Sequence, residues 1–240
     1  MQLPAVEKRR AASIGAAGPM EALERFLGHA SVRDGFRAGD GGGHGEPTFY
    51  LVLEGGPMAV MKPGATDVSQ EKAKAEVAAY RIARMFGFRD LVAPTVLRAM
   101  RHPDSGERMW ACVQAAWAHA EKDVAWDGVV PDADVWEAAL FDAIIGSTDR
   151  SHGWMVLKTR PPRLRLFDQG NGLGPDTSPP GSVFYDKKRG TDLPRPLLAR
   201  LVEGFERLPA DLGNLLNQVR LEGVALRVER LIEAEKLSLP

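Results

Sequence analysis

The 240-residue sequence has a single cysteine, Cys112, and this scarcity excludes several kinds of site. One cysteine cannot form an intramolecular disulfide, and it cannot supply a zinc centre built from cysteine thiolates. Cys112 lies in the apolar run 109–113. We therefore expect it to be a small buried side chain rather than a nucleophile.

Long hydrophobic runs and an excess of charge of one sign are also missing. No segment approaches the ~18 apolar residues of a transmembrane helix, so no membrane span is expected. No strongly apolar stretch follows the basic residues 8–10, as it would in a secretory signal. The sequence has 31 lysines and arginines and 32 aspartates and glutamates. This balance gives no reason to expect a nucleic acid as partner. These absences together predict a cytoplasmic protein.

The first half of the chain is rich in glycine and in strand-forming residues. Residues 1–20 are predicted to be a poorly ordered N-terminal arm, followed by a short helix over 21–27. Segment 35–45 has six glycines in eleven residues, which predicts irregular structure. Beyond it the pattern predicts a hairpin of strands 48–53 and 58–62 that ends at Pro63-Gly64. A helix over 72–86, capped by Ser69, follows, and then two more strands over 91–97 and 109–114.

The second half is mainly helical. A helix that begins with Asp132 or Asp134 as its cap should run to about residue 145. Two short strands, 154–157 and 164–167, are joined by a Pro-Pro turn, and a loop over 168–193 precedes the terminal helices. Its basic cluster, 187–189, is interpreted as a solvated loop, with substrate docking as the alternative. The overall prediction is an α+β protein with an N-lobe over 21–115 and a helical C-lobe over 116–240.

A glycine-rich loop and a strand lysine form the first candidate site. Glycine lets backbone N–H groups approach phosphate oxygens closely, and Lys62 adds a positive charge. Glu76 lies on the buried side of the following helix, where it could hold Lys62 in an ion pair. The alternative is a flexible loop, a strand lysine at the surface and a solvated glutamate.

Two aspartates form the second candidate site. Asp149 follows an apolar helix, and Asp168 follows a short strand about twenty residues later. Carboxylates at the ends of neighbouring hairpin strands can share one cleft, where one activates a hydroxyl and the other binds a divalent cation on a phosphate. Loop aspartates are more often turn formers or caps. The order of glycine loop, lysine, glutamate and two aspartates favours phosphate chemistry.

Four stretches in this order resemble a known family: 60–63, 75–81, 91–95 and 141–170. The sequence is similar to the bacterial proteins related to phosphatidylinositol 3- and 4-kinases, a branch of the atypical kinases that includes the HipA toxin kinases. The resemblance covers about residues 40–175. It implies a two-lobed protein-kinase-like fold, with ATP and Mg²⁺ or Mn²⁺ as cofactors.

The resemblance also implies a role for each matching residue. Lys62 would contact the ATP phosphates and Glu76 would position it, while Asp149 would be the catalytic aspartate and Asp168 would bind Mg²⁺. The glycines that would cover the phosphates are Gly41, Gly42, Gly43 and Gly45. The strand against which adenine would stack is Gln114 to Trp117.

The sequence departs from the family's Asp-Arg-His-x-x-Asn motif. Ser151 stands in place of the histidine, which is absent or displaced by one position to His152. His152 would then contact a phosphate or a proton, or bond to the loop backbone. Trp154 stands where the metal-binding asparagine belongs, and an indole offers only a donor. Asn171 could replace that ligand, although a turn-forming role is the alternative.

These features predict an ATP-dependent phosphotransferase that acts on a protein hydroxyl or on itself. A lipid acceptor is disfavoured, because segment 172–180 carries no positive charge. Three alternatives stay open. The chain could be a pseudokinase that binds nucleotide or a partner without turnover, a nucleotidyl (AMP) transferase on the same fold, or an unrelated α+β protein. The acceptor, protein or small molecule, is unknown from the sequence.

Overall fold

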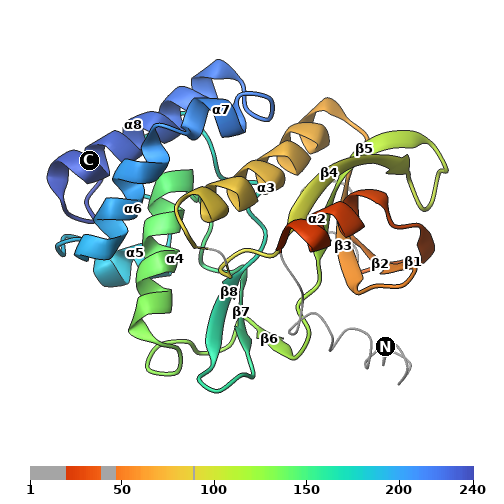
Figure 1. Cartoon of the computed structure of the whole chain (residues 1–240), viewed down its shortest axis with the longest axis horizontal. Coiled ribbons are helices and arrows are strands. Elements are labelled where there is room, and N and C mark those ends of the chain that lie inside the picture. The colour runs from red at the N-terminus through yellow and green to blue at the C-terminus, as the bar shows by residue number, and fades with distance from the viewer. Residues whose placement is uncertain (1–19, 39–46, 89) are drawn as a thin grey trace. The chain divides into compact units, whose positions relative to one another are not determined.

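The computed structural model of the chain describes residues 20–38, 47–88 and 90–240 (Figure 1). The chain divides into two compact units. One comprises the described residues up to Val77 together with Ala93–Ala120, and the other comprises Ala78–Val92 and Glu121–Pro240. Helix α3 (Asp67–Met85) contributes residues to both. Within the described ranges, we find no helix with the length and apolarity needed to cross a bilayer.

The first unit contains a five-stranded antiparallel sheet with the strand order β1-β2-β3-β5-β4 (Figure 1). Neighbouring strands pair in a continuous ladder from one edge to the other. The strands are β1 (Val32–Arg37), β2 (Phe49–Leu53), β3 (Met58–Gly64), β4 (Thr95–Arg101) and β5 (Arg108–Ala115).

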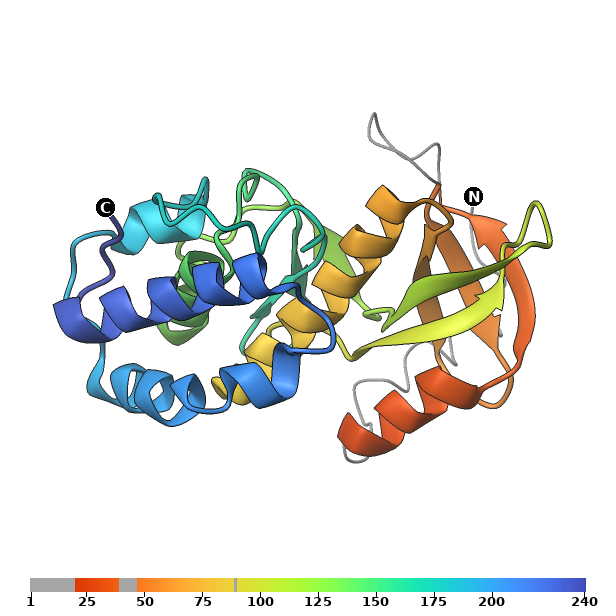
Figure 2. The same cartoon turned by 90° about the horizontal axis from the view of Figure 1, so that it is seen from above.

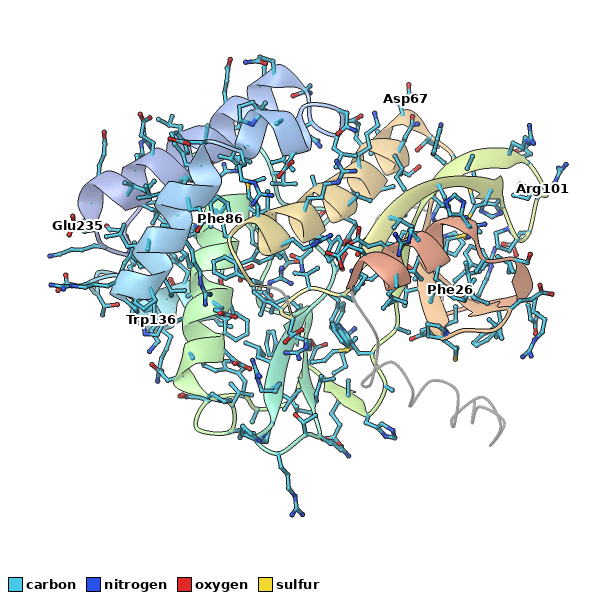
Figure 3. The ribbon with its side chains drawn as sticks, viewed as in Figure 1. Phe26, Asp67, Phe86, Arg101, Trp136 and Glu235 are labelled. Atoms are coloured by element: carbon cyan, nitrogen blue, oxygen red, sulfur yellow. The ribbon has the colours of Figure 1, made fainter. Side chains whose placement is uncertain are left out.

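One face of this sheet packs against α2 (Met20–His29) and forms the core of the unit. Alternation along β2 buries Phe49 and Leu51 while Tyr50 stays exposed. Phe26 of α2, labelled in Figure 3, lies so close to Gly56 that a Cβ there would be 2.0 Å from the ring. Glycine at that turn therefore lets the helix approach the hairpin.

The prediction of irregular structure over 35–45 was wrong for its first residues, because strand β1 extends to Arg37. Gly35 and its neighbours as far as Arg37 pair with β2, because ladder hydrogen bonds are made by the main chain and need no side chain. Strand β3 likewise continues through Pro63 and Gly64 instead of ending before them. The β2 ladder stops at Met61, so Pro63 lies where one side of β3 has no partner strand, a position that tolerates proline.

The start of α3 and the start of β4 also differ from prediction. Thr66, not Ser69, precedes the helix, and the two residues form a reciprocal capping box in which each backbone N–H donates to the other's hydroxyl. Strand β4 begins at Thr95 rather than at Leu91. The residues before it include Val92, which forms an isolated bridge with Leu166 instead.

The second unit combines helices with a small sheet of order β6-β7-β8. The buried helix α4 (Asp132–Ile145) packs against α5, α8 and β8 (Figures 1 and 2). Phe86 lies against Gly204 of α6, where a Cβ would be 2.5 Å from the ring (Figure 3). The other elements are β6 (Ala120–Lys122), β7 (Trp154–Leu157), β8 (Arg163–Leu166), α5 (Val183–Lys188), α6 (Arg195–Phe205), α7 (Leu208–Leu212) and α8 (Gln218–Ala234).

Two predictions for this unit were wrong. Neither Asp132 nor Asp134 caps α4: the N-cap is Pro131, and the buried Asp134 carboxylate accepts hydrogen bonds from Arg163 Nε and Leu164 N. The predicted loop over 168–193 contains helix α5, which ends in the basic cluster. There Lys188 pairs with Asp132 at 2.6 Å and its side chain is only 14% exposed, so it is not a solvated loop residue.

Candidate functional site

The first group of candidate residues is an ion pair in the sheet unit. Lys62 lies on β3, and its Nζ donates to Glu76 Oε1 on α3, as the sequence predicted. The Glu76 side chain is 1% exposed and that of Lys62 is 28% exposed. A buried carboxylate requires a charged partner, so the pair holds the lysine in one place while part of its side chain stays accessible.

The glycine-rich loop connects β1 to β2. Its described ends are joined where Ala38 N donates to Thr48 O at 2.8 Å. The glycines predicted to cover phosphates, Gly41, Gly42, Gly43 and Gly45, lie outside the described residues. Their role stays a prediction.

The predicted adenine-binding stretch begins at the end of β5. Gln114 is buried, and its Nε2 donates to Thr95 Oγ1 at 2.9 Å. This amide is engaged within the sheet, so a contact between its side chain and adenine would require loss of that bond. Trp117 is half-buried and packs against the core of the sheet. The adenine contact of both residues stays a prediction.

The second group of candidate residues, in the helical unit, is organised by a buried arginine. Arg150 is 1% exposed, and its Nη1 donates to two carbonyl oxygens, Gly153 O at 2.9 Å and Phe167 O at 2.7 Å. Its Nη2 donates to Gln169 Oε1, and Phe167 N donates to Gly153 O at 2.9 Å. One guanidinium thus joins the loop that follows Asp149 to the residues on either side of Asp168.

The charge of Arg150 is balanced by Asp142, a fully buried residue of α4. Asp142 accepts from Arg150 Nε at 3.2 Å and from Ser182 Oγ at 2.7 Å. Burial raises the pKa of Asp142, and the Arg150 charge and the Ser182 hydrogen bond oppose that rise. Sequence reasoning assigned no role to Asp142 or to Arg150. A signal was available, because a carboxylate within the apolar run 138–145 requires a basic partner.

Arg227 is a second buried guanidinium that sequence reasoning missed. It lies on α8 and donates to Ile144 O at 2.8 Å and to Gly174 O at 2.9 Å. It thereby holds the segment after Asp168 against the end of α4. Burial lowers its pKa to about 10.

The side chains predicted to do the chemistry lie at the surface of these loops. Asp149 is exposed, and its Oδ1 accepts from Ser151 Oγ at 2.9 Å. Asp168 is also exposed and has a φ of 61°, a left-handed conformation in which aspartate is enriched. His152 and Asn171 are exposed as well, and the carbonyl of Asn171 accepts from Thr148 Oγ1 at 3.2 Å.

Trp154, which the sequence resemblance aligns with a metal-binding asparagine, makes structural contacts here. Its indole Nε1 donates to Val124 O at 2.9 Å, and its ring meets that of Phe184 edge-on, with centroids 5.7 Å apart. These contacts tie β7 to its surroundings. The tryptophan thus packs against an aromatic neighbour and does not supply a metal ligand.

The residues fit Mg²⁺ bound with a nucleotide, but not a metal held by protein alone. Across the part of the chain that the structure describes, no three histidine, cysteine or acidic side chains are grouped so that they could hold a metal ion. Mg²⁺ needs less, because it is commonly bound by one or two carboxylates together with substrate phosphates and water. The exposed carboxylate of Asp168 meets that requirement.

Comparison with known proteins agrees with this geometry at the level of fold. No protein family and no curated protein matches the sequence. Among solved structures, the chain is similar to one described as the crystal structure of the Golgi casein kinase. The TM-score is 0.61 at 14% identity, over 89% of this chain and 74% of that chain.

The chain has a kinase-like fold. The predicted fold class, an α+β kinase-like protein with an antiparallel sheet in its first part and helices in its second, is confirmed. The likeness is to an atypical kinase, and it does not distinguish one branch of such kinases from another. At this level of identity it shows the fold alone.

Proposed function

We propose that the protein is an ATP-dependent phosphotransferase that acts on a protein hydroxyl or on itself. The observation that carries the proposal is the ion pair between Lys62 of β3 and the buried Glu76 of α3, in the sheet unit of a kinase-like fold. An amine fixed by a buried carboxylate is suited to bind phosphate oxygens, because its position is set before the nucleotide arrives.

The aspartates have separate roles in this proposal. Asp149 accepts the proton of the acceptor hydroxyl, and the Ser151 hydroxyl orients its carboxylate through the 2.9 Å hydrogen bond. Asp168 and, as a second candidate, Asn171 would hold Mg²⁺, which when bound neutralises charge on the phosphates. Arg150 is a positioning residue, since it joins the two loops without being exposed itself.

The branch that we propose is the bacterial phosphatidylinositol 3/4-kinase-like branch, on the resemblance of the sequence motifs. The acceptor is not a lipid in this proposal, because segment 172–180 has no basic residue with which to bind an anionic headgroup. A protein hydroxyl, or one of the chain's own, needs no such residue.

The proposal is tested by incubating the purified chain with labelled ATP and Mg²⁺ or Mn²⁺ and measuring autophosphorylation. Asp149→Ala and Asp168→Ala should each lower the signal at least about a hundredfold, because they remove a proton acceptor and a metal ligand. Asp186→Ala is the matched control, since Asp186 is an exposed aspartate of the helical unit with no proposed role. Equal labelling of all four proteins would exclude the kinase function.

A pseudokinase is the second candidate, and Trp154 is the observation that favours it. Its indole serves Val124 and Phe184, so the motif supplies one metal ligand fewer than the family's pattern. ATP binding without labelling of any protein would support this function. Mass spectrometry of the labelled chain distinguishes the remaining alternative, because an AMP adduct is far heavier than a phosphate adduct.

A further inference from the structure

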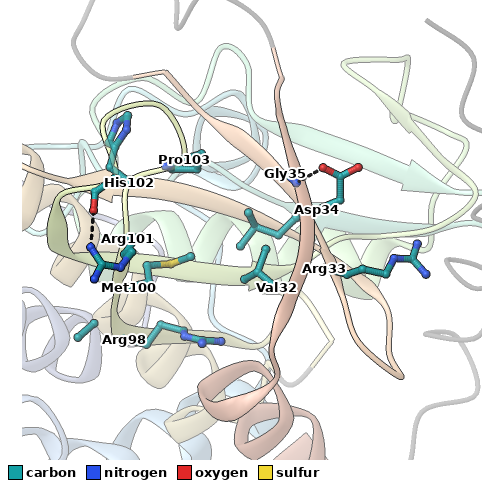
Figure 4. A pocket seen from close by; sticks show the side chains of 12 residues that line it. Val32, Arg33, Asp34, Gly35, Arg98, Met100, Arg101, His102 and Pro103 are labelled. Atoms are coloured by element: carbon teal, nitrogen blue, oxygen red, sulfur yellow. Dashed lines mark hydrogen bonds between the residues drawn. The ribbon is translucent and has the colours of Figure 1, made fainter.

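Arg98 and Gln169 each have a buried N–H group with no hydrogen-bond partner among the described residues. Arg98 lines a pocket beside β1 and β4 (Figure 4), and its Nη1 donates to Leu27 O at 2.9 Å and to Ala30 O at 3.0 Å. Arg98 therefore holds the end of α2, and this contact accounts for its place in the structure. Gln169 needs a different explanation, because it directly follows Asp168.

The side-chain amide of Gln169 is used at one end only. Gln169 is 1% exposed, and its Oε1 accepts from Arg150 Nη2. A guanidinium has donors and no acceptor, so the amide atom that faces Arg150 must be the oxygen. The Nε2 at the other end is the buried donor without a partner among the described residues. The acceptor of this amide is therefore engaged while its donor is not.

The unused donor indicates why the side chain at this position is an amide. A buried N–H group without an acceptor destabilises the folded chain, so its presence requires a reason. Methionine, which has a similar length, would avoid this loss but would offer Arg150 only a weakly accepting sulfur. Glutamate would accept, but it would bring a second carboxylate to a guanidinium that Asp142 already balances. Glutamine supplies the acceptor without a charge.

The bond to Gln169 bears on the backbone conformation of Asp168. The φ of Asp168 is 61°, a left-handed conformation that persists in a residue other than glycine where the surrounding structure fixes it. Arg150 Nη1 donates to Phe167 O, before Asp168, and Nη2 donates to the side chain of Gln169, after it. Gly172 N donates to Gln169 O at 2.9 Å and closes the turn that follows. One guanidinium thus fixes the chain on both sides of Asp168.

We propose that Gln169 is a positioning residue for Asp168. By accepting from Arg150 it holds Asp168 in the left-handed conformation, and it thereby sets the direction of the exposed carboxylate that would hold Mg²⁺. A ligand group fixed in advance loses less conformational freedom when the metal binds. The role in metal binding rests on the proposed function. The effect on the backbone does not, and it is measured in the chain without ligand.

The first test is amide hydrogen exchange of the full chain without ligand, measured at 167–172 relative to α6 of the same unit. Gln169→Met removes the acceptor at nearly constant side-chain length, so exchange at 167–172 should be at least about tenfold faster, the effect of losing one charge-assisted hydrogen bond. Gln169→Glu keeps the acceptor and should keep the slow exchange.

Ser182→Ala is the matched control within the same buried cluster. It removes the hydrogen bond from Ser182 Oγ to Asp142 Oδ2 but neither of the bonds that flank Asp168. It should lower the overall stability and leave the relative exchange at 167–172 unchanged. Should Gln169→Met fail to fold, Gln169→Asn replaces it, because an acceptor one methylene shorter is withdrawn from Arg150 while the amide is kept.

The second test is autophosphorylation as a function of Mg²⁺ concentration. Gln169→Met should raise the Mg²⁺ concentration for half-maximal labelling at least about tenfold, because the carboxylate of Asp168 is no longer fixed before the metal binds. Gln169→Glu should restore the lower concentration, and Ser182→Ala should not change it. A structural role alone would predict no such separation between the variants.

The two tests separate this inference from the proposed function. Faster exchange in Gln169→Met, with no labelling even of the unchanged chain, would support the backbone role and overturn the role in metal binding together with the kinase. The proposal as a whole would be overturned if exchange at 167–172 were the same in Gln169→Met as in the unchanged chain. Equally fast exchange in Gln169→Glu or Ser182→Ala would also overturn it, even in a chain that labels itself.

Discussion

At the scale of single residues, the two aspartate loops depend on one guanidinium. Arg150 is buried, and it can be buried only because Asp142 balances its charge and three further acceptors satisfy its N–H groups. A lysine could supply the charge but not the planar set of donors. Asp149 and Asp168, for which we propose the chemistry, stay exposed while a neighbouring side chain positions their backbone.

Gly153 is the residue at which this arrangement can be tested. Its φ is 85°, and a Cβ there would be 2.7 Å from Arg150 Nη1 and 2.9 Å from Phe167 O. Gly153→Ala should therefore displace Arg150 and cost about 2–4 kcal/mol of unfolding free energy, the sum of a left-handed penalty and overpacking. Urea denaturation measures this change.

Gly128→Ala is the control for backbone strain alone. Gly128 has a φ of 71°, but among the described residues, its two chain neighbours aside, no heavy atom lies within 4 Å of its added Cβ. It should lose about 1–2 kcal/mol, from the left-handed conformation only. If the two variants were equally stable, the close approach of Arg150 and Phe167 to Gly153 would have no energetic weight.

At the scale of elements, the sequence predicted strands best where apolar residues alternate without glycine. Strand β2 and helix α4 follow their patterns. Strand β1 was missed because it is mostly exposed and contains Gly35, so no alternation of apolar side chains marks it, and it is held by main-chain pairing with β2. Helix α5 is too short to show a period. The ion pair of Lys62 with Glu76 was predictable, since the helical period placed the glutamate on the buried face.

The capping box of α3 gives a prediction for an element. Thr66 Oγ1 accepts from Ser69 N at 3.2 Å, and Ser69 Oγ accepts from Thr66 N at 2.9 Å. Thr66→Ala should cost about 1 kcal/mol, because it leaves a helix-terminal N–H without its acceptor. Ser69→Ala should cost a similar amount by the reciprocal bond. The double variant should cost less than the sum of the two, since the hydroxyls also bond to each other at 2.9 Å. Strict additivity in urea denaturation would show that the hydroxyls act separately.

At the scale of the whole molecule, fold and function are predictable to different depths. The fold is shared with a solved kinase at 14% identity, because the patterns that build the sheet and the helical unit survive extensive substitution. The proposed chemistry depends on a few positions, and at the one that the sequence resemblance aligns with a metal ligand, Trp154 makes packing contacts instead. Sequence order was therefore enough to predict a kinase-like fold, whereas activity depends on side chains that must be tested directly.

Nucleotide binding gives the prediction that belongs to the whole chain. If Lys62 contacts the phosphates and Asp168 the metal, ATP with Mg²⁺ should slow amide exchange in two segments far apart in sequence, β3 and the residues after β8. It should also raise the unfolding free energy by about 2.7 kcal/mol at a nucleotide concentration a hundred times Kd. Hydrogen exchange with mass spectrometry measures the first effect and thermal unfolding the second.

Removal of the metal separates the contribution of Asp168 to nucleotide binding from that of Lys62. EDTA should abolish the protection at 167–172, because in the proposal Asp168 contacts the nucleotide only through the metal. It should weaken but not abolish the protection at β3, where Lys62 contacts the phosphates directly. Lys62→Met should produce the reverse pattern. Because a bound nucleotide must slow exchange in both segments together, protection confined to one of them at saturating ATP and Mg²⁺ would contradict a single nucleotide bound by these residues.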